Sequence, residues 1–185
     1  KAGNQRFLAG EPLNRDLSSQ VHETSGGQYP FAVVLSCIDS RVPAEIVFDQ
    51  GIGDIFNVRI AGNFVNRDIL GSLEFACKVA GSKAILVLGH TSCGAIKGAC
   101  DDVALGNLTG MLDNLKTAVF SVDNSSGDRS SANKEFVQKV SDMNVKLSIA
   151  AIKAQSPVLR EMLDQGEIAI VGGMYDVATG KVAFI

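Results

Sequence analysis

Four short runs of apolar, often β-branched residues divide this chain of 185 residues. They lie at Phe31–Ser36, Ile55–Val58, Ala84–Leu88 and Ile168–Val171, and helical patterns separate them. Short runs that are apolar at nearly every position are typical of strands buried on both faces of a parallel sheet, whose neighbours must be joined by crossover connections. The spacing therefore predicts an α/β fold with a mostly parallel four-stranded sheet flanked by helices.

Three helices are predicted from periodicity and end signals. Between the second and third runs, apolar residues from Ile69 to Ala80 recur at helical spacing, and Gly81 stands at the position that commonly ends a helix. A long amphipathic pattern covers residues 134–154. A further helix is expected to begin at Ser156 and Pro157, because Ser is a preferred N-cap and Pro is favoured in the first turn, and to end at Gly166.

The remaining segments lie outside this alternation. Residues 181–185 follow a turn at residues 178–180 and predict a C-terminal antiparallel edge strand. Residues 124–128, rich in Asn, Ser and Gly, predict an exposed loop. Residues 1–25 are polar with scattered apolar side chains, so we expect a helical arm that packs on a partner subunit. Together the pattern predicts a single domain over residues 1–185.

Composition excludes several classes of function. A hydrophobic content of 46% with 20% charged residues is enough for one core. The net charge of −3 and the lack of a basic cluster argue against nucleic acid as a partner. No apolar run reaches the roughly 20 residues that cross a bilayer, and no signal-peptide core begins the sequence. We therefore expect no membrane partner and a cytoplasmic location, unless a removed leader directs the chain to the periplasm or an organelle.

Metal-ligating side chains follow two of the predicted strands. Cys37, Asp39 and Arg41 come directly after the first run, and His90 and Cys93 come after the third. In an open α/β sheet, ligands bind at the carboxyl ends of the strands, so the two groups are expected to meet. Two thiolates and one imidazole provide three protein ligands, the number typical of a catalytic zinc that keeps its fourth position open.

Asp39 allows two arrangements of this site. Its carboxylate is close enough in sequence to Cys37 to become a fourth zinc ligand, which would close the site. Alternatively, Arg41 holds the carboxylate in a bidentate pair and keeps it away from the metal. The first arrangement predicts a resting or structural zinc, and the second predicts a catalyst.

These motifs resemble those of the β-class carbonic anhydrases. The resemblance rests on C-x-D-x-R at residues 37–41 and H-x-x-C at residues 90–93, and it continues through residues 51–56, 71–75 and 172–176. It covers the chain from about Asn4 to Ile185. It implies zinc-dependent, reversible hydration of carbon dioxide to bicarbonate and a proton by zinc-bound hydroxide. The implied cofactor is one Zn²⁺ per subunit, and the implied assembly is a homodimer or a dimer of dimers.

The resemblance also assigns roles to individual residues. The implied zinc ligands are Cys37, His90 and Cys93, the implied catalytic dyad is Asp39 and Arg41, and the implied substrate-binding residues are Gln28, Phe56, Phe75 and Gly94. In this family the carbon dioxide pocket lies at a dimer interface. Because two thiolates cancel the charge of the metal, we expect activity to rise toward alkaline pH.

This chain departs from relatives at two places. Phe75 stands where plant-type enzymes have Tyr, which argues against proton transfer at that position. Val34 stands where the bicarbonate-inhibited branch has Trp, although Arg59 and Tyr175 match the other two residues of that effector pocket. We therefore expect an incomplete effector pocket and an enzyme of the open branch.

Two alternative functions share the same zinc ligands. One is hydrolysis of a related small heteroallene such as carbon disulfide, which access to the pocket would distinguish from carbon dioxide hydration. The other is a non-catalytic, zinc-stabilised assembly module in which Asp39 permanently closes the metal site.

Overall fold

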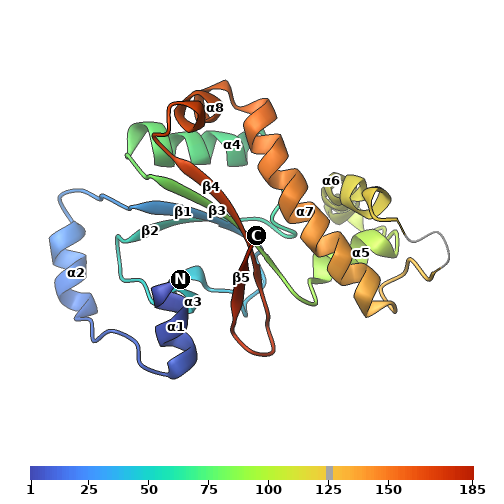
Figure 1. Cartoon of the computed structure of the whole chain (residues 1–185), viewed down its shortest axis with the longest axis horizontal. Helices are drawn as coiled ribbons and strands as arrows, with labels where there is room; N and C mark the ends of the chain where they lie inside the picture. The colour runs from blue at the N-terminus through green and yellow to red at the C-terminus, as the bar shows by residue number, and fades with distance from the viewer. Residues whose placement is uncertain (124–126) are drawn as a thin grey trace.

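The protein is built around one five-stranded sheet (Figure 1), in a computed structural model that describes residues 1–123 and 127–185. The strand order is β2-β1-β3-β4-β5. The strands are β1 (Ala32–Ser36), β2 (Ile55–Arg59), β3 (Ala84–His90), β4 (Ala169–Tyr175) and β5 (Val182–Phe184). The first four are parallel and β5 is antiparallel to β4. The predicted α/β class and the antiparallel C-terminal strand are confirmed.

Helices lie on both faces of the sheet and beyond its carboxyl end (Figure 1). One face is covered by α4 (Arg67–Glu74), a π-helical turn η1 (Phe75–Val79), α7 (Lys134–Gln155) and α8 (Pro157–Asp164). On the other face lie α1 (Ala2–Ala9) and α3 (Ala44–Val47). Past the carboxyl ends of the strands, α5 (Gly94–Cys100) and α6 (Gly106–Ser121) pack against α7. The remaining helix, α2 (Leu17–Thr24), lies at the edge of the molecule.

The strand β1 shows how the sheet separates two cores. Val33 and Leu35 are fully buried against the face covered by α4, α7 and α8, whereas Val34 belongs to the cluster on the opposite face. Successive side chains of a strand point to opposite faces, so both faces of this central strand are apolar. Burial on both faces is the reason that the first run reads as continuously hydrophobic.

Helix ends follow the predicted signals where a polar cap or a glycine is present. Ser156 caps α8 by accepting a hydrogen bond from the backbone N–H of Leu159 (3.1 Å), and Pro157 begins the helix. A cap of this kind stabilises a helix by about 1 kcal/mol. Gly81 and Gly166 have φ of 84° and 70° after the ends of η1 and α8, a conformation that favours glycine.

The structure differs from the predicted helices in two respects. The helix predicted over residues 69–80 begins two residues earlier and changes to π geometry at Phe75, with the N–H of Ala80 bonded to the carbonyl oxygen of Phe75 (2.9 Å). No helix was predicted between residues 94 and 121, where the structure has α5 and α6. Both helices matter for the site described below.

The two helices of the N-terminal arm behave differently. Asn4 in α1 is buried, and its side chain bonds the carbonyl oxygens of Val47 (3.1 Å) and Gly180 (2.9 Å) and the N–H of Val182 (3.0 Å). The first helix therefore packs on its own chain. In contrast, α2 has no buried residue. Packing of the arm on a partner subunit stays a prediction.

Two further predictions concern surface segments and membranes. The loop predicted at residues 124–128 lies mostly outside the described residues, which resume at residue 127. Among the helices that are described, none combines the length and the apolar character needed to span a bilayer.

Candidate metal centre

Three buried donor side chains meet at the carboxyl ends of β1 and β3. Cys37 directly follows β1, His90 is the last residue of β3, and Cys93 is the residue before α5. Because β1 and β3 are parallel neighbours, their carboxyl ends lie side by side. The two sulfur atoms and the histidine nitrogen lie within 4.8 Å of one another, and none of the three residues is more than 4% exposed. These residues form a site that can hold a metal ion.

The histidine is prepared to bind a metal. Its Nδ1 lies 2.9 Å from the carbonyl oxygen of Thr91, so this nitrogen carries the ring proton and donates it. The other nitrogen, Nε2, is buried and has no hydrogen-bond partner among the described residues. A buried acceptor without a partner is costly, and a metal ion bound beside the two sulfurs would remove that cost. Two thiols and this imidazole match the donor set of a zinc site.

The two thiols have opposite tendencies to ionise. A hydrogen bond from Cys93 lowers the pKa of the Cys37 thiol, and the backbone N–H of Gly62, 3.3 Å from Cys37 Sγ, lowers it further. The pKa of Cys93 is raised by that same interaction with Cys37 and by burial. Without metal, Cys37 is therefore the first of the pair to become a thiolate, the form that binds metal.

Asp39 is paired with Arg41 at the edge of this cluster. Its two carboxylate oxygens accept hydrogen bonds from Arg41 Nε (2.9 Å) and a terminal nitrogen (2.7 Å), and Oδ1 also accepts from the Arg41 backbone N–H (3.0 Å). Arg41 holds the pKa of this carboxyl well below its usual range, although burial opposes the shift. The nearer oxygen lies 3.9 Å from His90 Nε2. The carboxylate thus stays ionised beside the donors while its oxygens face Arg41.

Arg59 holds the loop that carries these residues. Its guanidinium donates to the backbone oxygens of Cys37 (2.9 Å) and Asp39 (2.6 Å). The resemblance placed Arg59 in an effector pocket, whereas the geometry gives it a direct structural contact with the metal-site loop. Tyr175, the other matched effector residue, is buried in the cluster of Val34.

A small cavity of about 280 Å³ opens beside Cys37 and Asp39. Gly94 lines it, and a Cβ atom at this position would meet no heavy atom within 4 Å. The remaining lining residues are mostly apolar: Ile38, Ala61, Ala95, Gly98, Leu108, Met111 and Leu112. Three of them belong to α6, which sequence reasoning did not predict. Their spacing of three and four residues was a usable signal of an amphipathic helix.

The other predicted substrate residues lie near the opposite end of the sheet. Gln28 is exposed before β1, and Phe56 in β2 pairs with Val33, near the start of β1. The rings of Phe56 and Phe75 contact edge to face, with centroids 6.2 Å apart, and line a separate surface depression. At a rise of about 3.3 Å per residue, the length of β1 alone separates Gln28 from Cys37 by more than roughly 13 Å. One chain does not bring these residues to the metal site.

Fold and donor set together define a class: an α/β protein with a buried Cys₂His metal site at the carboxyl end of a parallel sheet. The protein family described as carbonic anhydrase matches residues 32–182. Carbonic anhydrase 2 of Mycobacterium tuberculosis is 40% identical over 98% of this chain and 87% of that protein. The chain belongs to the β-carbonic anhydrase family.

Solved structures have the same fold. The β-carbonic anhydrase CafA of Aspergillus fumigatus is 26% identical, with a TM-score of 0.78 over 100% of this chain and 88% of that chain. A tetrameric β-carbonic anhydrase of Sordaria macrospora is 24% identical, with a TM-score of 0.76 over 91% of this chain and 90% of that one. The second likeness supports the fold alone.

Proposed function

We propose that this chain catalyses the reversible hydration of carbon dioxide to bicarbonate and a proton, with zinc held by Cys37, His90 and Cys93. The observation that carries the proposal is the pairing of Asp39 with Arg41 beside these donors, which leaves a three-residue ligand set. Zinc at this site would act as a Lewis acid that lowers the pKa of water and supplies hydroxide for attack on carbon dioxide.

Asp39 is proposed to orient the nucleophile. An ionised carboxylate accepts a hydrogen bond from a hydroxyl group and so fixes the direction of its lone pairs. Arg41 keeps Asp39 ionised, and Arg59 fixes the backbone oxygen of the same residue. With both carboxylate oxygens on Arg41, Asp39 does not serve as a fourth ligand. This pairing argues against a permanently closed, non-catalytic zinc module.

The cavity beside Asp39 is suited to an apolar substrate. Carbon dioxide has no net charge or dipole, so apolar walls and one hydrogen-bond donor are enough to bind it. The α6 side chains Leu108, Met111 and Leu112 provide such walls. Gly94 is proposed to bind substrate by leaving space beside the zinc ligands.

A second copy of the chain is proposed to complete this pocket. Gln28 would orient the substrate oxygen, and Phe56 and Phe75 would add apolar walls, each reaching the metal centre of the other subunit. Support comes from their place in the single chain, where Gln28 is exposed and Phe75 is 50% exposed. A homodimer or a dimer of dimers would bury these groups.

Stopped-flow measurement of carbon dioxide hydration across pH, with and without a chelator, tests the proposal. We expect activity that increases toward alkaline pH and is lost when zinc is removed. A protein with zinc bound that shows no hydration above about pH 8 would contradict the proposal. Carbon disulfide assayed in parallel distinguishes the two heteroallenes, because both would use the same zinc ligands.

A further inference from the structure

A row of buried polar side chains runs along α7 on the side that faces the interior. Ser141, Asn144 and Ser148 are spaced by three and four residues, so they share one face of the helix. They are 3 to 4% exposed. Burying a polar group is unfavourable unless it is hydrogen-bonded, so the partners of this row indicate what it does.

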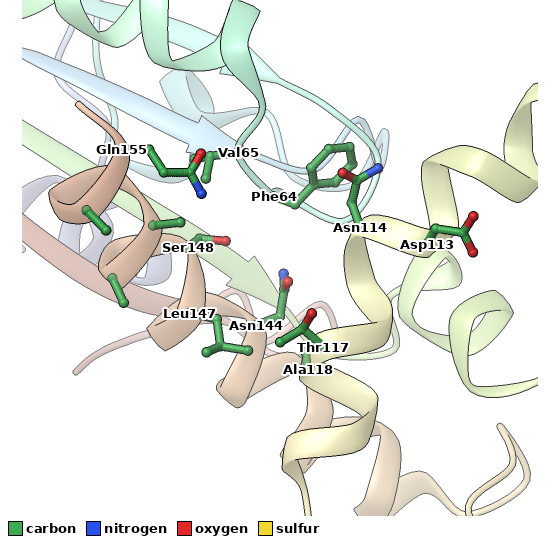
Figure 2. A pocket seen from close by; sticks show the side chains of 13 residues that line it. Phe64, Val65, Asp113, Asn114, Thr117, Ala118, Asn144, Leu147, Ser148 and Gln155 are labelled. Atoms are coloured by element: carbon green, nitrogen blue, oxygen red, sulfur yellow. The ribbon is translucent and has the colours of Figure 1, made fainter.

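Two members of the row bond a loop rather than their own helix. Asn144 Nδ2 donates to the carbonyl oxygen of Gly62 (2.7 Å), and Ser148 Oγ donates to the carbonyl oxygen of Asn63 (3.2 Å). Ser141 Oγ instead donates to Val137 within α7 (2.9 Å). Figure 2 shows Asn144 and Ser148 on one side of a cavity, with Phe64 of the same loop close by.

The loop that they hold has an unusual backbone. Gly62 and Asn63 are consecutive residues with φ of 79° and 41°. Gly62 also packs so closely that a Cβ atom there would lie 2.7 Å from Leu115 of α6. Asn is one of the few non-glycine residues that adopt this conformation readily, but two consecutive residues with positive φ still need contacts that hold them. The hydrogen bonds from Asn144 and Ser148 to the carbonyl oxygens of Gly62 and Asn63 are such contacts.

The same loop contacts a metal-ligating sulfur. The backbone N–H of Gly62 lies 3.3 Å from Cys37 Sγ and donates to it, while the carbonyl oxygen of Gly62 accepts from Asn144. Gly62 is thus fixed on one side by α7 and directs its N–H toward the sulfur on the other. No other residue of α7 has a described hydrogen bond to Gly62.

We propose that Asn144 is a positioning residue of the metal centre: it fixes Gly62 so that this N–H donates to the Cys37 thiolate, with Ser148 in a supporting role. The inference rests on the proposed function in taking Cys37 as a zinc ligand. A hydrogen bond to a thiolate withdraws negative charge from sulfur and fixes its direction, and groups that orient ligands in this way influence metal affinity.

The test compares three variants of α7. Asn144→Leu keeps the branched shape and removes the donor, and the cavity of about 480 Å³ beside it leaves room for the slightly larger side chain. We expect zinc affinity, measured by competition with a chromogenic chelator, to decrease on the order of ten-fold. The sulfur-to-metal charge-transfer band of the cobalt-substituted protein should shift as well. Ser148→Ala should change both readouts in the same direction by less.

Ser141→Ala is the matched control, because its hydroxyl is equally buried but bonds only its own helix. It should leave zinc affinity and the cobalt spectrum unchanged, whatever it does to thermal stability. If Asn144→Leu fails to fold, Asn144→Ser replaces it, because the shorter serine side chain cannot reach the carbonyl oxygen of Gly62.

The outcomes separate this inference from the proposed function. Zinc affinity and a cobalt spectrum in the Asn144 variant that match those of Ser141→Ala would overturn the inference alone. A wild-type chain that binds neither zinc nor cobalt would overturn the proposed function and the inference with it. Weaker zinc binding together with a shifted band in the Asn144 variant only would support both.

Discussion

The two ends of the parallel sheet differ in how complete they are. At the carboxyl end, Cys37, His90 and Cys93 are nearly inaccessible to solvent, and hydrogen bonds from Arg59 and Gly62 fix the loop around them. At the amino end, Gln28 is exposed, Phe75 is 50% exposed, and Tyr29, next to Gln28, is 90% exposed. The chain by itself builds the metal-binding half of the proposed site and leaves the other half uncovered.

This difference shows which part of the proposed activity needs only a folded chain and which part needs the assembly of two chains. The carboxyl end is covered by α5, α6 and α7, which pack on one another and enclose the donors. The amino end has large exposed apolar side chains, among them Phe31 (56%) and Phe75 (50%). Exposed apolar surface of this kind marks an interaction site. Metal binding should therefore survive in a monomer, whereas catalysis should not.

The largest expected effect is loss of metal when a predicted zinc ligand at the carboxyl end of the sheet is replaced. Cys93→Ser removes one zinc ligand, so zinc measured by atomic absorption should become substoichiometric and hydration activity should be lost with it. Cys77→Ser is the control, because Cys77 is as buried as Cys93 but lies outside the cluster. Equal zinc content in the two variants would mean that the cluster is not the metal site.

Asp39→Ala should separate metal binding from activity. The zinc ligands are untouched, so zinc content should stay near that of the wild type, while hydration should slow by about 10²-fold because the nucleophile is no longer oriented. Asp164→Ala, at an exposed carboxylate in α8, provides a control for loss of a negative charge. Loss of zinc from the Asp39 variant, or full activity in it, would contradict the proposed role.

Mixing two inactive variants tests whether the open end completes the site of another subunit. Asp39→Ala damages the carboxyl end and Gln28→Ala the amino end, so a mixed dimer contains one site with both ends intact. If sites are shared between subunits, equal mixing after dissociation and reassociation should restore about a quarter of the wild-type activity. No recovery despite verified subunit exchange would mean that each chain builds its site alone.

The smallest effect concerns the N-terminal arm, residues 1–25, which Asp49 anchors through Arg6 and Arg15. Burial opposes ionisation of Asp49, but hydrogen bonds from Arg6 and Arg15 outweigh it and lower its pKa to about 2. Because this pKa is lowered in the folded chain, the anchoring interaction is present above the ordinary carboxyl pKa of 3.8 and is lost as pH decreases through about 2.

The Leu13 amide reports this titration, since it donates to Asp49 Oδ2 (3.2 Å). In NMR spectra, the chemical shift of the Leu13 amide should change with a midpoint near pH 2 in the wild type. In Arg15→Leu, this midpoint should increase toward pH 3.8. The Ser19 amide, which bonds Asp16 instead, should keep its midpoint. An unchanged Leu13 midpoint in Arg15→Leu would show that Arg15 does not anchor the arm.

Sequence alone predicted those parts of the fold that depend on local pattern. The parallel strands were evident because burial on both faces leaves continuous apolar runs, and the donors were placed because they directly follow two of those runs. The α8 helix was evident from Ser156 and Pro157. In each case, the signal lies within a few residues of the feature it predicts.

Features that depend on distant contacts were not predicted. The N-cap residue of α6 is Leu105, which makes no side-chain cap, and Gly106 and Gly110 weaken the helical pattern, although Leu108, Leu112 and Leu115 keep the right spacing. Packing against α5 and α7 compensates for these weak local signals.

The contacts around the metal-site loop were hidden for the same reason. Arg59 and Gly62 reach Cys37 across 22 and 25 residues, and no short motif encodes such a pairing. The distance of Gln28 and Phe56 from the metal ligands within one chain was equally hidden in the residues themselves, and only the resemblance, which places the carbon dioxide pocket at a dimer interface, pointed to it.

The contacts of Asn4 also have a consequence for the order of events during protein synthesis. Its side chain bonds Gly180 and Val182, and the second of these partners is 178 residues further along the chain. A ribosome makes α1 well before those partners, which emerge only after α5, α6, α7 and α8, the four helices described between β3 and β4, have been made. Throughout that interval, Asn4 can bond only Val47, so two of the three hydrogen-bond partners of its side chain are missing.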